Sequence, residues 1–148
     1  MATGKTNARY ITVDVDAADG STVNDVSASV ATISSVGLTY DVSDVTAYSD
    51  GVHNVTLGHP TASLSMSGPL SNTATIGSHT VFSAIAGSMA NTITVTIQFG
   101  IRATPTTGDP EFEGEYYCTS YVVNGADATY TANFDPATAT APAWGTVS

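Results

Sequence analysis

Hydrophobic and polar residues alternate along several stretches of the chain, which is the pattern of a β-strand with one buried face. The clearest stretch is 91–103, where isoleucine and valine alternate with threonine and glutamine. Shorter stretches with the same period lie at 9–17 and 61–67, and Asp14 and Asp16 fall on the polar side of the first. The pattern predicts a mainly β protein.

Two dipeptides that accept positive φ angles predict tight turns between strands. Asp19-Gly20 follows the first strand, and we expect 23–33 to pair back on it. Asn124-Gly125 lies between two stretches rich in β-branched and aromatic residues, which predicts a hairpin over 115–134. The preceding stretch, 104–114, is rich in turn residues.

A helical spacing occurs at 78–89. Apolar residues recur there at intervals of three and four up to Met89, and Ser78 stands where an N-cap is expected. A helix this short, with Gly87 inside it, depends on packing against other elements. We therefore expect an antiparallel β-sandwich or barrel with one short flanking helix.

The stretch 37–60 has no regular period and is longer than most loops of compact domains. It carries large apolar side chains that linkers rarely contain, so we expect a long loop or loose hairpin that buries them against a neighbour. Beyond Pro136 the chain is mostly Ala, Thr and Pro, which predicts a C-terminal arm, 136–148, outside the core. Residues 1–8 are expected to form an N-terminal arm.

The charge balance excludes several classes of function. The 148 residues, enough for one domain, include 3 Lys and Arg against 13 Asp and Glu, a formal net charge of -10. So few cations cannot neutralise a run of phosphates, which excludes tight binding to the outside of nucleic acid or to an anionic membrane. We find no signal-peptide pattern and no long apolar run, so the chain is expected to stay inside the cell that makes it.

The sequence offers no set of residues that converges on a catalytic or metal site. The stretch from Asp14 to Gly20 resembles a calcium loop, but its spacing is one residue off and the bidentate glutamate is missing. Cys118 is the only cysteine and lies in a strand pattern, where a buried hydrophobe is its ordinary role. The histidines share no ligand spacing: His53, His59 and His79. The sequence therefore predicts neither an enzyme nor a metal or cofactor site.

Two further groups of residues have ordinary structural interpretations. Glu111, Glu113 and Glu115 alternate, which predicts a charged rim rather than the carboxylate pair of a glycoside hydrolase. The tyrosines of the predicted hairpin favour cross-strand packing or a subunit contact, with stacking on a sugar as the alternative. These tyrosines are Tyr116, Tyr117, Tyr121 and Tyr130.

The segment 33–51 contains the run Asp-Val-Thr-Ala-Tyr-Ser-Asp, from Asp44 to Asp50, at the start of the long loop. A Ser-rich strand, a short helix, a long alternating strand, a Pro-Glu-Phe-Glu-Gly segment and a terminal hairpin follow in order. In this run and this order, residues 9–135 resemble the major tail tube proteins of long-tailed (siphovirus-type) bacteriophages.

The resemblance implies a structural virion protein. Six copies would form a ring, and stacked rings would form a hollow tail tube that conducts DNA during ejection without binding it specifically. It further implies assembly in the host cytoplasm, location in the virion tail, and tape measure, terminator and distal tail proteins as partners. The chain departs from the pattern in having no appended Ig-like domain and in its C-terminal arm.

The resemblance also assigns two groups of candidate site residues. The long loop would reach the adjacent ring, which makes its polar and aromatic residues candidates for inter-ring contact: Asp41, Asp44, Thr46, Tyr48 and Asp50. Acidic residues on or beside strands are candidates for facing the lumen, because a like-charged wall does not retain DNA: Asp14, Asp16, Glu115 and Asp127.

Two other functions stay open at this point. Another virion component, such as a capsid decoration or tail terminator protein, would share the β-rich, lysine-poor composition and form discrete oligomers. A β-sandwich carbohydrate-binding module would use the tyrosine-rich hairpin.

Overall fold

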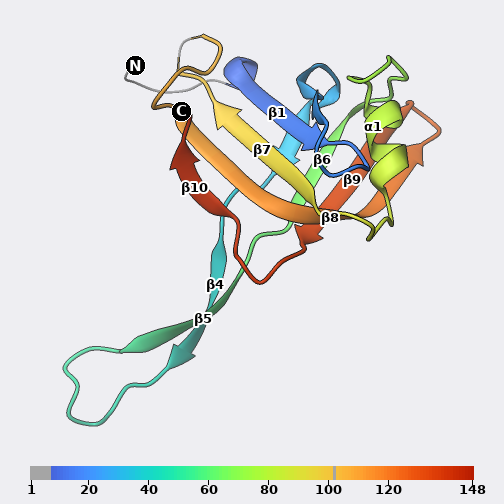
Figure 1. The fold of residues 1–148 in the computed structure, drawn as a ribbon. Coiled ribbons are helices and arrows are strands. Elements are labelled where there is room, and N and C mark those ends of the chain that lie inside the picture. Colours follow the sequence, from blue (N-terminus) through green and yellow to red (C-terminus); the bar gives the residue numbers. More distant parts are fainter. Residues whose placement is uncertain (1–7, 102) are drawn as a thin grey trace.

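The computed structural model describes residues 8–101 and 103–148. Most strands form one eight-stranded antiparallel sheet that wraps around the core (Figure 1). Its order is β2 (Val23–Asp25), β1 (Ile11–Asp16), β7 (Ile93–Phe99), β8 (Pro110–Asn124), β9 (Thr129–Pro136), β6 (Leu64–Pro69) and β3 (Thr32–Ser34), with β10 (Ala143–Thr146) paired to β8. The predicted mainly β, antiparallel fold is confirmed.

The expected barrel is not closed. The pairing path ends at β2 on one side and at β3 on the other, so the described sheet has two edges and an open seam between them. A side-chain bond explains why the chain does not continue from β2 along β1. The Val13 N–H of β1 donates to the Ser27 hydroxyl of the short 3-10 helix η2 (Ser27–Ser29) at 2.8 Å. The chain then crosses to β6, where β3 pairs instead.

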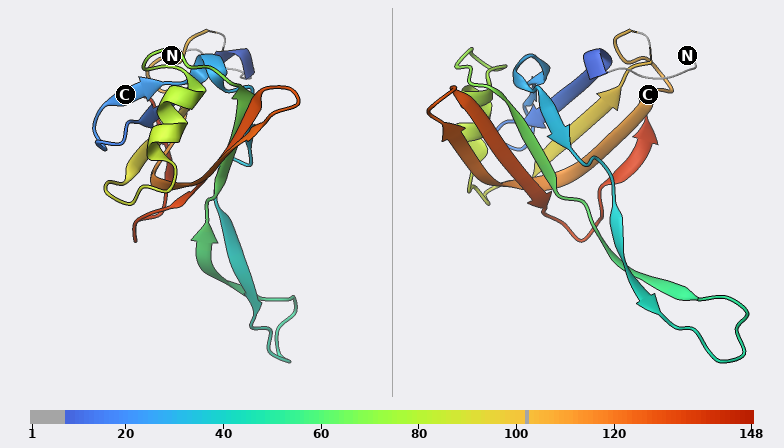
Figure 2. Two further views of the ribbon diagram at one scale, coloured as in Figure 1. Left: turned by 90° about the vertical axis from the view of Figure 1, so that its right-hand side faces the viewer. Right: turned by 180° about the vertical axis from the view of Figure 1, so that it is seen from behind.

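The helix α1 (Ser78–Ile85) lies against the sheet, as Figures 1 and 2 show, and its Val81, Phe82 and Ile85 side chains are buried. Phe82 is fully buried, and its ring lies 5.3 Å from Tyr130 and 5.8 Å from Phe134 of β9, centroid to centroid. The alternating apolar residues of β1, β6, β7, β8 and β9 complete this core. Cys118 is buried in it, as predicted, and burial raises the pKa of its thiol to about 11.

The helix differs from its prediction at both ends. It ends at Ile85, because Gly87 adopts a positive φ of 74° and its N–H donates to the Cys118 carbonyl of β8. Met89 is consequently 74% exposed rather than part of the apolar stripe. Ser78 does not cap the helix. Its hydroxyl donates to the Pro69 carbonyl and accepts from another backbone N–H, which ties the helix start to the end of β6.

Strand β8 begins at Pro110, inside the stretch interpreted as turns, and pairs with β9 in the predicted hairpin. The connection between β8 and β9 has four residues, 125–128, rather than a two-residue turn, with Ala128 at a positive φ of 55°. The predicted hairpin is thus confirmed, but the prediction of a two-residue turn was wrong.

The predicted C-terminal arm returns to the sheet. β10 pairs antiparallel with the first half of β8, opposite residues 110–113. The Trp144 ring lies 5.1 Å from Phe112 and 5.7 Å from Phe99, centroid to centroid. Aromatic contacts therefore hold this segment on the sheet. The Ala, Thr and Pro composition of the segment did not predict this pairing. The N-terminal arm falls almost entirely outside the described residues, with Ala8 opening the 3-10 helix η1 (Ala8–Tyr10).

Strands β4 (Thr39–Asp44) and β5 (Val55–Thr61) form a separate two-stranded sheet that projects from the domain (Figures 1 and 2). The long loop is therefore an ordered hairpin with a ten-residue tip, 45–54. We call residues 39–61 the projecting hairpin. No helix in the described part of the chain has the length and apolar character needed to cross a membrane.

Candidate assembly surfaces

The projecting hairpin leaves an unusual amount of apolar surface in water. Both strands are exposed over nearly their whole length. Exposed large apolar side chains follow the strands and the tip: Tyr40, Val42, Val45, Tyr48, Val52, Val55 and Leu57. A two-stranded hairpin is marginal in water, and apolar patches of this kind mark interaction sites. The projecting hairpin is therefore the first candidate surface for assembly.

Hydrogen bonds inside the tip fix its shape. The Asp44 carboxylate accepts from the Thr46 N–H at 2.9 Å, and the Thr46 hydroxyl accepts from the Asn54 N–H at 2.8 Å. The Asp50 carboxylate accepts from the Ala47 N–H at 2.8 Å and from the Asn54 amide at 2.9 Å. The Thr46 hydroxyl, which also donates to Asp44, and then the Thr46 N–H hold the pKa of Asp44 below the ordinary range of an aspartate, and the bonds from Ala47 and Asn54 do the same for Asp50.

These bonds divide the predicted inter-ring residues into two kinds. Asp44, Thr46 and Asp50 order the tip through their own hydrogen bonds. Tyr48 is fully exposed at the tip, and Asp41 is exposed on β4. Contact with a neighbour would therefore involve Tyr48 and the apolar side chains, with the aspartates shaping the loop that presents them.

The outer face of β1, β7 and β8 is the second candidate surface, and we call it the acidic face. Rows of paired residues cross the three strands there, with Asp14 beside Thr96 and Thr96 beside Glu113. Neutral side chains of β7 donate to the glutamates of β8. The distances are 2.6 Å from Thr94 to Glu115, 3.1 Å from Thr96 to Glu113 and 2.7 Å from Gln98 to Glu111.

Electrostatics on the acidic face is repulsive. Burial, and then the negative charges of Asp25 and Glu111, raise the pKa of Asp14. Arg9 is the sole lysine or arginine among residues 8–101 and 103–148, and it lies at the other surface of β1, beside Ile11 and Val13. Within residues 8–101 and 103–148, hydroxyl and amide groups therefore donate to the glutamates of the acidic face.

The structure brings together only some of the predicted lumen residues. Asp14 and Glu115 lie on the acidic face. Asp16 lies on the same side of β1 as Asp14, but it is only 4% exposed and its carboxylate accepts from the Thr94 N–H at 3.3 Å. Asp127 lies apart, in the turn between β8 and β9, where it accepts from the Thr129 N–H.

Sequence reasoning missed Glu111 and Glu113 as members of this face. Their alternation with Glu115 predicts a charged rim, but the turn residues of 104–114 place the expected strand start at residue 115, whereas β8 begins at Pro110. A period of two across all three glutamates was the available signal, because side chains at this spacing share one face of a strand.

The remaining candidate groups have structural roles. Two of the four tyrosines are buried core residues, with the Tyr116 hydroxyl donating to the Ala62 carbonyl at 2.8 Å and the Tyr130 hydroxyl to the Ser29 carbonyl at 2.7 Å. A sugar cannot stack on buried rings, which weighs against the carbohydrate-binding alternative. His79 lies 3.0 Å from the Tyr121 hydroxyl, and the described part of the chain holds no group of three ligands suited to a metal.

No protein-family profile and no curated protein sequence matches the chain. Solved structures do match over nearly its full length. A chain of the virion of a native gene transfer agent particle aligns with a TM-score of 0.60 and 16% identity, over 96% of this chain and 98% of that one. The tail of an empty gene transfer agent particle, with C6 symmetry, gives 0.60 and 17% over the same shares. The chain has a tail-tube-like fold.

A third match extends the range of particles that contain this tail-tube-like fold. It is a chain of an extracellular contractile injection system at the sheath/tube terminator, in the extended state. The TM-score is 0.61 with 12% identity, over 98% of this chain and 99% of that one. All three matches come from virion, tail or injection-system particles, and none is described as an enzyme.

Proposed function

We propose that the chain is the subunit of a phage-type tail tube. Six copies form a ring, and rings stack into a hollow tube that conducts DNA during ejection. The observation that carries the proposal is the full-length fold similarity to the tail of a C6-symmetric particle. In this proposal the protein belongs to the virion tail, is assembled in the host cytoplasm, and meets tape measure, terminator and distal tail proteins.

The two candidate surfaces have different roles in such a tube. The acidic face lines the lumen, where carboxylates repel the phosphates of passing DNA and leave it hydrated. The projecting hairpin carries the inter-ring contact, because burial of its apolar side chains favours association. Asp41, Asp44, Thr46, Tyr48 and Asp50 belong to that contact, either directly or by ordering the tip.

A tail terminator is the second candidate function, since one of the matches is to a sheath/tube terminator. A terminator caps the tube as a discrete ring and does not polymerise. The two candidates thus differ in whether rings of this chain stack on one another.

Negative-stain electron microscopy of the purified chain at high concentration distinguishes them. Long hollow tubes with a regular axial repeat support the tube subunit, and rings that never stack support the terminator. Persistent monomers under all salt conditions would contradict both.

A variant without the projecting hairpin tests the inter-ring contact. Thr39 pairs with Thr61, so residues 40–60 can be replaced by Asn-Gly, which closes a two-residue turn. We expect a folded subunit, checked by circular dichroism and thermal melting, that no longer stacks. Tubes formed by this variant would show that the hairpin does not carry the contact.

A further inference from the structure

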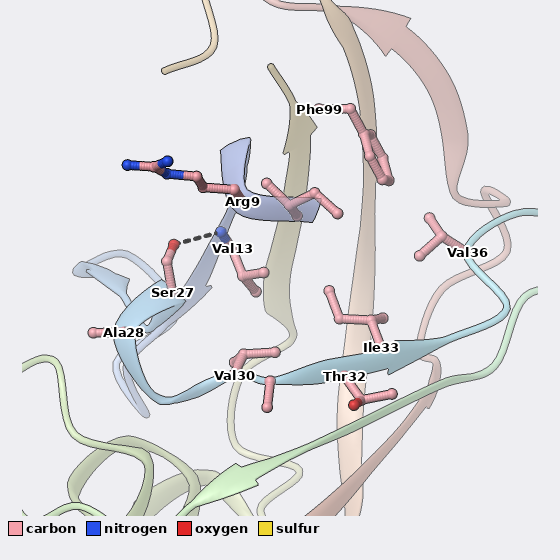
Figure 3. A pocket seen from close by; sticks show the side chains of 11 residues that line it. Arg9, Val13, Ser27, Ala28, Val30, Thr32, Ile33, Val36 and Phe99 are labelled. Carbon is pink, nitrogen blue, oxygen red and sulfur yellow. Dashed lines mark hydrogen bonds between the residues drawn. The ribbon is translucent and has the colours of Figure 1, made fainter. Parts of the chain in front are cut away.

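An apolar groove lies along the open seam of the sheet. Its volume is about 500 Å³, and β1 and β3 form its opposite walls (Figure 3). The side chains that give it apolar character are Ile11, Val13, Val30, Ile33, Val36 and Phe99. Figure 3 shows Val13, Val30, Ile33, Val36 and Phe99 arranged around a common space, with the Ser27 hydroxyl accepting from the Val13 N–H at the side.

The sheet leaves this groove partly open to solvent. Val13 is buried, but Ile11, Val30, Ile33, Val36 and Phe99 are only partly buried against the core. In a closed barrel, neighbouring strands would cover these side chains, whereas here the pairing ends at β2 and β3. The groove is therefore apolar surface that folding of one chain leaves unburied.

Within the described part of the chain, the projecting hairpin is an apolar element that pairs with no strand outside its own two-stranded sheet. Its exposed valine, leucine and tyrosine side chains match the aliphatic and aromatic lining of the groove. The charges are complementary as well. The projecting hairpin contains Asp41, Asp44 and Asp50 and no lysine or arginine, while Arg9 stands at the edge of the groove. Other approaches to the subunit meet more acidic surface, above all the acidic face.

The positions of the two features favour contact between copies. The projecting hairpin extends away from the sheet, and η1, which carries Arg9, lies at the end of the domain away from the hairpin tip in every view (Figures 1 and 2). One surface donates and a different surface accepts, which is a heterologous contact that propagates from copy to copy. Stacked rings require a contact of this kind.

We propose that the projecting hairpin of one copy inserts its apolar side chains into the seam groove of a copy in the next ring, with Arg9 facing the hairpin carboxylates. This inference rests on the proposed tube function and specifies the receptor for the hairpin. It gives the open seam a role, since the neighbouring copy covers the apolar side chains that β2 and β3 leave exposed.

Cysteine cross-linking tests the contact. Val52→Cys in the hairpin tip and Ala28→Cys at the groove are combined in one chain, and assembled tubes are treated with a short bismaleimide. The native Cys118 is buried and adds little background. We expect a ladder of covalent multimers, because every copy carries one tip and one groove. The matched control combines Val52→Cys with Ala126→Cys in the exposed β8–β9 turn and should give no ladder.

A groove-filling variant tests the same contact without changing the hairpin. Ala31→Trp adds bulk to the groove lining and should give folded subunits that do not stack, whereas Ala126→Trp should assemble as the wild type does. Tubes of the Val52→Cys/Ala28→Cys variant that give no ladder, or normal tubes from Ala31→Trp, would overturn the groove as receptor and leave the tube function standing. Wild-type protein that never stacks would overturn the tube function and this inference together.

Discussion

Asp14 is a residue whose charge opposes folding of the single subunit. It is partly buried, and Asp25 and Glu111 add negative charge around it, so its pKa is raised above the ordinary aspartate value of 3.8. A carboxyl with a raised folded-state pKa stabilises the fold only when protonated. Its contribution is complete below the unfolded pKa and is lost as the pH rises through the folded pKa.

Asp14→Asn should therefore raise the Tm of the unassembled subunit at pH 7, because it removes a carboxylate that repels its neighbours. The gain should shrink as the pH falls toward 3.8, where the wild-type carboxyl becomes protonated. Thermal melts at both pH values measure it, with Asp41→Asn on the exposed hairpin as a control for the loss of one charge. An equal gain from both variants at pH 7 would contradict the local repulsion.

Residue types alone could identify the acidic character of the chain but not which carboxylates share a face. Asp14 and Asp16 alternate along β1 and line the same hollow, yet Asp14 is partly exposed whereas Asp16 is buried against a backbone N–H. Asp127 and Glu115 likewise appeared equivalent beside strands. Neighbouring strands bury Asp16, and Asp127 falls in the turn between β8 and β9, and neither difference is encoded in the local sequence.

At the scale of elements, alternation predicted the strands well where one face is buried, as in β1, β6 and β7. It predicted less well where tertiary contacts set the ends. β8 starts at Pro110 within a turn-rich sequence, and α1 stops where Gly87 pairs with Cys118. β10 forms because Trp144 packs on two aromatic rings far away in the sequence. Long-range packing of this kind overrides local propensity.

The packing of α1 gives a test at this scale. Phe82→Ala should lower the free energy of unfolding by about 3–5 kcal/mol, because a fully buried aromatic side chain leaves a cavity against Tyr130 and Phe134. Denaturant unfolding of the subunit measures the loss. Met89→Ala, just beyond the helix, should change stability by no more than about 0.5 kcal/mol. Comparable losses of stability from the two variants would contradict the structure, in which the buried side of the helix ends before Met89.

At the scale of the whole molecule, the proposed tube gives the acidic face a measurable role. Reversing one charge on that face should create a site for phosphates in every subunit around the lumen. Tubes of Glu113→Lys should co-sediment short duplex DNA at low salt and release it as salt rises. Wild-type tubes should not retain the DNA.

Asp127→Lys is the matched variant for this experiment, since it makes the same charge change in the β8–β9 turn. The structure separates Asp127 from the acidic face, so we expect its tubes to behave as the wild type does. DNA retained by Asp127→Lys but not by Glu113→Lys would place the lumen on the other side of the subunit.

The open seam and the projecting hairpin also bear on the subunit before it assembles. A free subunit with both apolar surfaces uncovered is prone to aggregate, and a net charge of -10 counters this by keeping copies apart. That repulsion weakens as the Debye length falls from about 30 Å at 0.01 M to about 8 Å at 0.15 M ionic strength. The same charge thus sets a kinetic barrier to polymerisation, and ionic strength controls how long a pool of free subunits persists.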